Sequence, residues 1–416
     1  MVSRTKKPRV RLATTPLDVS HLRQHSLRYA LAALFIILTS SVVIWLVLKA
    51  VIVSVSPAVV TPVVTTPVAP SSMVKFAAMG DMLGHDSVVA QAKTATGYDF
   101  APYFESIRPL YADADVVFCN QEGLVSGEAF GISGYPAFNS PSEFAEGLSR
   151  GAGCNVVNLA NNHIGDKNQA AIDATIDVWT AQKPLALTGA NKTPEDQKRV
   201  AYFTKNGIKF AFVAFADFNN NDKTSDYSVN LYHDQELVEQ LLEEARKNAD
   251  FVIVSAHWGT EDDGRVDTDQ EETAQLFADL GADIVIGTGP HVLQKVSYVN
   301  GQDSHKTLVW YSLGNMLNSQ LEIDQLTGGI AGFSVTKTTT GITIDQITFQ
   351  PTFMSYRWSA ADRAAQNLLA RSQLRLQPLR SASDAIVSLF PTSSVAERTG
   401  YVQRVIGSEV DVTITP

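Results

Sequence analysis

The chain has 416 residues, of which 45% are hydrophobic and 18% are charged, so it can bury a large core and is not a disordered protein. This length suits two domains or one large α/β domain. The formal net charge of -10 and a pI near 5.3 exclude a general nucleic-acid binder, which needs a basic face.

The amino-terminal part of the chain has the pattern of a membrane anchor. Residues 1–28 carry seven lysines and arginines against one acid, and residues 30–48 carry no charged side chain. Nineteen such residues rise roughly 28 Å as a helix, close to the thickness of a hydrocarbon core. We therefore predict a single-pass transmembrane helix at 29–53, after a cytoplasmic basic segment at 1–28.

A Pro/Thr/Val linker at 54–72 should then hold a large extracytoplasmic domain off the cell membrane. The alternative is a cleaved signal peptide. The apolar run is long for a signal peptide, and no clear cleavage site follows it.

Beyond residue 72 the chain alternates short apolar runs with helical patterns, which favours a largely parallel sheet in an α/β domain. Helical periodicity is clear at 237–245 and 274–280. Apolar and polar residues alternate on both sides of 338–341, which predicts a β-hairpin. The runs that we expect to form strands lie at 74–79, 116–119, 156–160, 210–216, 251–256, 284–286 and 308–311.

The segment 155–166 runs from one of these strands into polar groups and then into a helix. Asn161, Asn162 and His163 stand where the strand ends, and Asp166 has the position of a helix N-cap. Open α/β sheets bind ligands at such turns, where the His163 imidazole would face solvent. The alternative is a structural turn in which the asparagines accept left-handed backbone geometry and His163 only caps the helix.

Polar side chains follow several other apolar runs in the same way. The carboxyl ends of parallel strands meet at one edge of a sheet, so these nitrogen and oxygen donors should gather there. Mixed carboxylate and imidazole ligands suit manganese, iron, zinc or magnesium, and two such cations can clamp an in-line displacement at phosphorus. The donors are Asp81, His85, Glu122, Asn162, His163, His257 and His291.

The two cysteines, Cys119 and Cys154, each adjoin a predicted buried strand. We expect free thiols in the core. A disulfide is the alternative, because an oxidising exterior permits one but sequence does not show whether the two Cβ atoms meet.

Several motifs occur in a characteristic order: Gly80-Asp81, Asn120-Gln121-Glu122, Tyr135-Pro136-Ala137-Phe138, Ala160-Asn161-Asn162-His163 with Asp166, His257-Trp258-Gly259 with Glu261, Pro290-His291-Val292-Leu293-Gln294 and Tyr311-Ser312-Leu313-Gly314-Asn315. This order resembles the bacterial capsule synthesis proteins of the CapA or PgsA type. These proteins take part in making poly-γ-glutamate and belong to the calcineurin-like metallophosphoesterase superfamily. The resemblance implies a four-layer αββα sandwich, whereas periodicity alone suggests a doubly wound single sheet.

The resemblance also implies roles for individual residues. His163 would be the catalytic proton donor. Where the family often has His-Pro-His, this chain has Gly289-Pro290-His291, so we expect a weak second metal site, which a histidine at 289 would strengthen. The implied metal ligands are Asp81, His85, Glu122, Asn162, His257 and His291. The implied substrate-contacting or supporting residues are Asn120, Asn161, Asp166, Glu261 and Asn315.

The expected function is that of a CapA-like domain at 73–356 that assists synthesis or export of poly-γ-glutamate through a metal-dependent, hydrolase-like site. Its expected partners are the membrane and the synthase or export subunits. One alternative is a non-catalytic scaffold that binds metal or polymer, and another is a surface metallophosphodiesterase unrelated to capsule. Residues 357–416 are set apart as a carboxyl-terminal tail, with a weakly amphipathic helix expected at 368–376.

Overall fold

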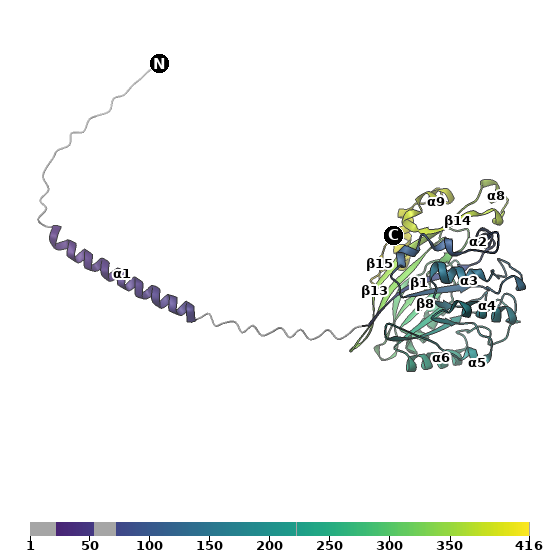
Figure 1. Ribbon diagram of the computed structural model, residues 1–416, viewed down its shortest axis with the longest axis horizontal. Helices are drawn as coiled ribbons and strands as arrows, with labels where there is room; N and C mark the ends of the chain where they lie inside the picture. The colour runs from purple at the N-terminus through teal and green to yellow at the C-terminus, as the bar shows by residue number, and fades with distance from the viewer. Residues whose placement is uncertain (1–21, 54–71, 222, 416) are drawn as a thin grey trace, which may run out of the picture. The chain divides into compact units, whose positions relative to one another are not determined.

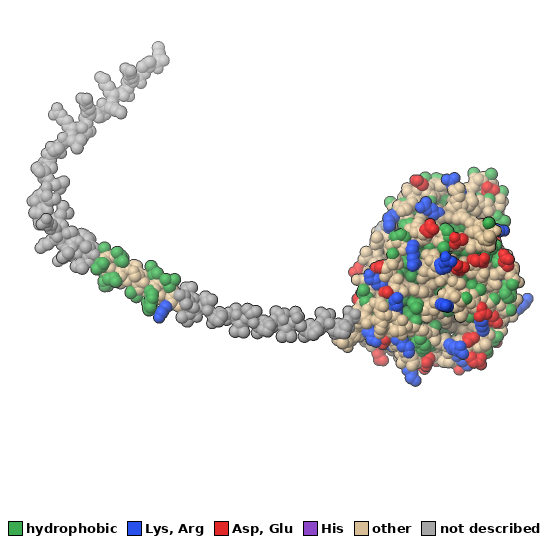
Figure 2. Space-filling view, viewed as in Figure 1, with side chains coloured by type: hydrophobic (Ala, Val, Ile, Leu, Met, Phe, Trp, Pro, Cys, Tyr) green, Lys and Arg blue, Asp and Glu red, His purple; other side chains and the backbone are tan. Residues whose placement is uncertain are grey.

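The computed structural model describes residues 22–53, 72–221 and 223–415, which fall into two units, one within residues 1–68 and one within 69–416. In the first unit, α1 (Leu22–Val53) contains a stretch, Ala32–Lys49, that is long and apolar enough to cross a membrane. Hydrophobic side chains are spread along the visible face of this stretch (Figure 2). A signal sequence near the amino terminus fits the same description. The expected basic segment up to residue 21 and the linker up to residue 71 lie outside the described residues.

The first sheet of the second unit is mixed (Figure 1). Its parallel strands are β1 (Ser72–Leu83), β2 (Val116–Glu122), β3 (Val156–Asn158) and β4 (Ala186–Thr188). On the other side of β1 follow three antiparallel strands: β12 (Thr327–Thr338), β13 (Gly341–Arg357) and β14 (Ser372–Pro378). Two short strands complete the sheet, with β11 (Asn315–Leu317) beside β1 and β15 (Thr413–Ile414) beside β13. The predicted hairpin is confirmed by the β12–β13 pairing.

The second sheet has the order β5-β6-β7-β8-β10-β9. Its central strands are parallel, as the apolar runs predicted. Strands of a parallel sheet are buried on both faces and therefore have continuous apolar sequences. The strands are β5 (Ala201–Lys205), β6 (Ile208–Ala216), β7 (Phe251–His257), β8 (Ile284–Thr288), β9 (Val296–Asn300) and β10 (Lys306–Trp310).

The two sheets pack face to face through aromatic side chains. The ring of Phe76 in β1 lies 5.3 Å from that of Phe210 in β6, and Phe118 in β2 lies 6.0 Å from Phe212. On the outer face of the second sheet, a separate apolar cluster joins its strands to α6 (Gln235–Asn248) and α7 (Thr268–Asp279). Helices α2 (Asp86–Ala92), α3 (Glu143–Gly147) and α4 (Gln169–Gln182) lie beside the first sheet (Figure 1). The expected four layers are therefore present.

Periodicity alone pointed to a single doubly wound sheet, and that interpretation is wrong. A strand buried between a sheet and a helix has the same continuous apolar run as a strand buried between two helices. Strand sequence therefore does not distinguish the two arrangements. The remaining helices are α5 (Pro194–Gln197), α8 (Ala360–Ala364), α9 (Ser383–Leu389) and α10 (Val395–Ile406).

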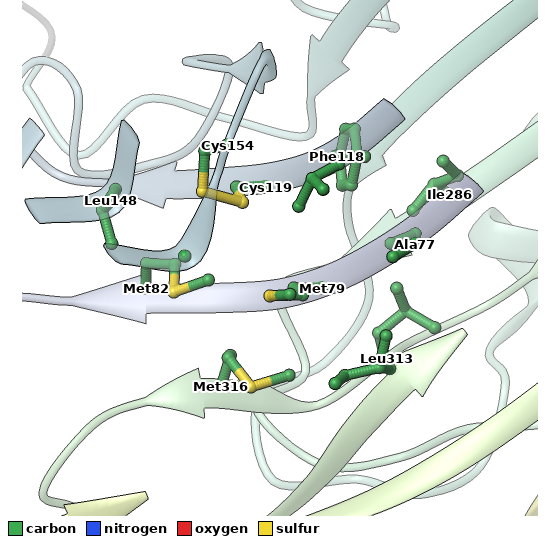
Figure 3. Close-up of a cluster of buried hydrophobic side chains, with 14 of the residues drawn as sticks. Ala77, Met79, Met82, Phe118, Cys119, Leu148, Cys154, Ile286, Leu313 and Met316 are labelled. Atoms are coloured by element: carbon green, nitrogen blue, oxygen red, sulfur yellow. A yellow bond between two sulfur atoms is a disulfide. The ribbon is translucent and has the colours of Figure 1, made fainter. Parts of the chain in front are cut away.

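Cys119 and Cys154 form a disulfide, so the expectation of two free thiols is wrong. Cys119 lies in β2, and Cys154 lies between α3 and β3, with 5.7 Å between the two Cα atoms. Leu148 and Met82 lie near this bond in the apolar cluster (Figure 3). The bond ties the strand that carries Glu122 to the chain leading into the next strand.

The carboxyl-terminal segment 357–416 folds onto the domain. Its strand β14 extends the first sheet beyond β13, and α9 and α10 bury Ile386 and Val402 (Figure 1). The helix expected at 368–376 is wrong, because Leu374 and Leu376 alternate with exposed residues and form part of β14. Period-two burial on a short run outweighs weak helical spacing.

Candidate metal centre

Strand ends of both sheets bring carboxylates and imidazoles together at one edge of the sandwich. Asp81 lies near the end of β1, Glu122 ends β2 and His257 ends β7. Donor atoms of these three residues lie within 4.8 Å of one another, and all three side chains are buried. They form a group that could hold a metal ion.

The Asp81 carboxylate is held by several hydrogen bonds. Its Oδ1 accepts from Nδ2 of Asn120 at 2.7 Å, and its Oδ2 accepts from the backbone N–H of Gly289 at 3.2 Å. His291 Nδ1 also lies 3.2 Å from Oδ2. Burial acts to raise the pKa of Asp81, but the partners, led by His291, lower it overall. The carboxylate is therefore positioned and kept charged.

Glu122 is the opposite case. Both of its carboxyl oxygens are buried and make no hydrogen bond to the described residues. Nε2 of His257 lies 3.9 Å from Oε1, and Nε2 of His291 lies 3.7 Å from it. Burial raises the pKa of Glu122 well above its ordinary value. A buried carboxylate without hydrogen bonds is costly unless an ion or a proton compensates it.

His257 is oriented at both ring nitrogens. Asn120 Nδ2, which can only donate, lies 3.3 Å from its Nδ1, and Thr288 Oγ1 lies 3.1 Å from the same atom. Nδ1 is thus assigned as the acceptor, so Nε2 carries the proton and donates to Oδ1 of Asn162 at 3.0 Å. Burial lowers the pKa of His257 to about 4, which keeps the ring neutral. A neutral imidazole is the form that binds metals.

His291 has a left-handed backbone, with φ of 61°. Its Nδ1 lies 3.1 Å from Oδ1 of Asn315 and faces Asp81, so this nitrogen is the donor. Burial opposes a charge on the ring, but Glu122 and Asp81 outweigh burial and raise the pKa of His291 to about 10. Strained non-glycine backbone of this kind concentrates at functional sites.

Gly289 does not leave a simple gap for a further histidine. Its φ is 111°, and a Cβ there would lie 2.7 Å from the carbonyl oxygen of Trp258. The expectation that a histidine at 289 would strengthen a second metal site is therefore wrong, since the backbone leaves no room for its Cβ. The N–H of Gly289 instead serves Asp81.

His163 pairs with Asp166 on the turn after β3. Nδ1 of His163 lies 2.7 Å from Oδ2 of Asp166 and 3.1 Å from Nδ2 of Asn220. The ring packs edge-on against Phe138 and is only 6% exposed, so the expected solvent-facing imidazole is wrong. Asp166 is not an N-cap, because Asn168 caps α4.

The remaining predicted residues surround this group. His85 is partly buried, its ring packs edge-on against Phe138, and burial lowers its pKa to about 3. It is not a member of the three-residue metal-binding group. Asn161 holds the turn, since its side chain bonds the backbone of Gly123, Gln121 and Leu159. Glu261 is exposed, and its negative charge acts to raise the pKa values of Glu122 and His291.

Sequence reasoning missed three supporting residues. Thr288 contacts His257, Asn158 donates to Oδ1 of Asn120 at 2.8 Å, and Asn220 contacts His163. Thr288 ends β8 and Asn158 ends β3, whereas the predicted strands stopped at 286 and continued to 160. Polar residues at the end of an apolar run are the signal that could have found them. Asn220 follows β6 by several residues, so only the fold brings it to His163.

Two facing sheets and a buried acid and imidazole group at their edge define an αββα protein with a candidate metal centre. Sequence comparison agrees with the resemblance noted above. The chain belongs to the family described as bacterial capsule synthesis protein PGA_cap, whose profile matches residues 75–320.

Two curated relatives are similar to part of the chain. The PGA biosynthesis protein CapA of Bacillus subtilis (strain 168) is 33% identical over 168 residues, which is 40% of this chain and 43% of that protein. The capsule biosynthesis protein CapA of Bacillus anthracis is 32% identical over 176 residues, 41% of each chain. The matches thus span less than half of either relative.

Solved structures give more distant likenesses. A phosphatase of Mycoplasma pneumoniae has 12% identity and a TM-score of 0.41, covering 68% of this chain and 94% of that one. A 5′-nucleotidase of Candida albicans has 8% identity and a TM-score of 0.39, covering 67% and 51%. We therefore assign the architecture from the strand order of the two sheets and not from these likenesses.

Proposed function

We propose that this protein is a membrane-anchored, extracytoplasmic CapA-like protein that assists synthesis or export of poly-γ-glutamate through a metal-dependent hydrolytic site. The role in capsule synthesis follows from the family. The anchor is supported by α1, and the extracytoplasmic placement by the disulfide, because disulfides persist in oxidising compartments.

One observation carries the proposal of a metal site. The carboxyl oxygens of Glu122 are buried and make no hydrogen bond within the described chain, while Asp81, His257 and His291 surround them. This donor set fits a hard or borderline divalent cation, held by these four residues with Asn162 beside His257. When bound, such a cation supplies Lewis acidity to the site.

The protein's own groups supply orientation and a proton. His163 is fixed through Nδ1 by Asp166, and its Nε2 makes no hydrogen bond within the described residues. That nitrogen can protonate a leaving group when the imidazole carries a proton on both nitrogens. Asn120 aligns Asp81 with His257, and Asn315 aligns His291.

The test combines metal counting with activity. Purified full-length protein in a non-ionic detergent is dialysed, its metal content is measured by mass spectrometry, and turnover is followed on γ-linked glutamate oligomers and on an aryl phosphodiester. We expect a bound divalent metal, and cleavage of the γ-linked oligomer that a chelator abolishes. Cleavage of the phosphodiester alone would instead favour a surface phosphodiesterase.

The scaffold alternative gives a different result in the same experiment. A protein that binds metal or oligomer but cleaves neither substrate under any metal condition would contradict the hydrolytic role. The matched control is Glu128→Gln, which removes an exposed carboxylate that is not a member of the donor group. It should leave both metal content and turnover unchanged.

A further inference from the structure

Arg371, just before β14, is a buried arginine without an ionic partner. Only 8% of the surface of Arg371 is exposed. Nε donates to the carbonyl oxygen of Leu368 at 2.8 Å, and the guanidinium lies 5.7 Å from the centre of the Tyr356 ring. Within residues 72–221 and 223–415, no carboxylate forms an ion pair with it.

The two terminal nitrogens of Arg371 make no hydrogen bond to the described part of the chain. Neither nitrogen is fully enclosed by protein, so both border solvent-accessible space. A buried guanidinium is costly unless an anion pairs with it, and its fork of donors matches a carboxylate or phosphate. The position therefore calls for an anion from outside the chain.

This arginine is connected to the candidate metal centre through Tyr356, whose hydroxyl donates to the carbonyl oxygen of Gln320 at 2.8 Å. Oε1 of Gln320 accepts from Nδ2 of Asn315, the residue that contacts His291.

The charge of Arg371 also acts on the imidazole of His85, where it adds to the effect of burial in lowering the pKa. The short 3-10 helix before it, Leu368–Ala370, packs against α2, which begins directly after His85. Gln91 of α2 fixes β14 by two hydrogen bonds to the backbone of Leu374.

The charge of Asp86 acts on Arg371 and raises its pKa, against the effect of burial. Asp86 is exposed, and its Oδ1 accepts from the backbone N–H of Gly134 instead. Tyr356 also lines a surface hollow together with Trp358, Arg363 and one acid, Glu322, and the Arg363 guanidinium lies 5.5 Å from the centre of the Trp358 ring. A second cation is thus present in the hollow that adjoins Tyr356.

Charge is distributed so that an acidic chain would meet this rim first. Residues 72–356 hold 18 lysines and arginines against 37 acids, whereas residues 357–416 hold 7 arginines against 5 acids. Most of the domain repels a polyanion, and the carboxyl-terminal segment attracts it. This segment lies outside the part of the chain that the family profile matches, 75–320.

We propose that Arg371 is an anion-binding residue at the rim of the metal centre, where its guanidinium takes a carboxylate of an acidic chain such as γ-linked glutamate. The identity of that chain rests on the proposed function, whereas the anion site rests on the arginine and its surroundings. Arg363 with Trp358 would hold the chain further from the metal centre.

The test measures binding without turnover. Full-length protein in a non-ionic detergent is stripped of metal with a chelator, and the binding of a fluorescently labelled γ-linked glutamate oligomer is followed by anisotropy. Arg371→Gln should weaken binding roughly 10- to 100-fold, the effect of losing hydrogen bonds between charged groups. Arg375→Gln is the matched control, because it removes an exposed arginine from β14, the strand that begins directly after Arg371.

Arg371→Lys should bind with intermediate affinity, since lysine keeps the charge but lacks the planar fork. The oligomer should raise the melting temperature of the natural protein and not that of Arg371→Gln. A γ-linked isoglutamine oligomer, in which each free α-carboxylate is replaced by an uncharged amide, should not compete. If Arg371→Gln does not fold, the affinity of Arg371→Lys decides, and wild-type affinity there contradicts a bidentate site.

Equal binding by the natural protein and Arg371→Gln would overturn the inference. So would equal losses in Arg371→Gln and Arg375→Gln, which would indicate general surface charge. Displacement by inorganic phosphate at concentrations as low as those of the oligomer would refute the assignment to a carboxylate chain. The binding assay contains no metal and measures no turnover. A protein that cleaves neither substrate can therefore still bind the oligomer, so this inference and the proposed hydrolytic role are tested independently.

Discussion

Oδ2 of Asp166 accepts two contacts at once, from Nδ1 of His163 at 2.7 Å and from the backbone N–H of Phe138 at 2.6 Å. The Asp166 carboxylate therefore holds the backbone at Phe138 while it orients the His163 imidazole. Phe138 also packs against the rings of His163 and His85. The geometry fixes one nitrogen of His163 and leaves the other for chemistry.

His163→Ala should reduce turnover on a cleaved substrate by on the order of 10² to 10⁴, the usual effect of removing a positioned general acid. Metal content should stay unchanged, because His163 is not in the donor group. His305→Ala, at a half-buried histidine beside Asp283 and outside the groups that could hold a metal, is the control and should keep full turnover. Full activity in His163→Ala would return this residue to a structural role.

Glu122→Gln should weaken metal binding at least 10- to 100-fold, since removing even a residue that only hydrogen-bonds a metal ligand has an effect of that order. In metal-free protein, however, the change should not lower the melting temperature, because it removes a buried acid that has no hydrogen bond. A chelator should therefore lower the melting temperature of the natural protein and leave that of Glu122→Gln unchanged. Calorimetry with and without chelator checks this, and a chelator effect of equal size in both proteins would contradict it.

Gly289→Ala should destabilise the domain by roughly 1 to 3 kcal/mol, as expected for an L-residue forced into a rare backbone conformation. It should also weaken metal binding, because the N–H of Gly289 supports Asp81. The comparison is Gly281→Ala, another glycine with a positive φ, of 84°, at the end of α7. That variant should lose stability but keep its metal, as metal titrations would report.

Replacing both Cys119 and Cys154 by serine should lower the free energy of unfolding by about 4 kcal/mol, in line with a cross-link that closes a loop of this size. The separation of 35 residues is the relevant quantity. Urea unfolding of the double variant, compared with the natural protein in the presence and absence of reductant, measures the difference. Reductant should have no effect on the double variant.

The amino-terminal helix should anchor the protein with residues 1–28 inside the cell, because its basic flank favours the cytoplasm. Protease added to intact cells should then remove the large domain. Protection of that domain, or recovery of a mature protein that begins after residue 53, would show that α1 is oriented otherwise or is a cleaved signal.

The sequence alone determined most of the strands, because buried strands have short apolar runs that polar residues end sharply. It also indicated that Asp81, Glu122 and His257 would meet, since the ends of parallel strands share one edge. The hairpin and the family followed from local patterns and motif order. These are features that neighbouring residues specify among themselves.

Only the tertiary structure decided which sheet faces which, because an apolar strand does not record what covers it. Contacts across the fold also paired Cys119 with Cys154 and left no room at Gly289 beside Trp258. The same holds for Arg371. In the sequence it is one of seven arginines in residues 357–416. Its charge is buried because β14 docks against α2 through Gln91, which is a contact between distant parts of the chain.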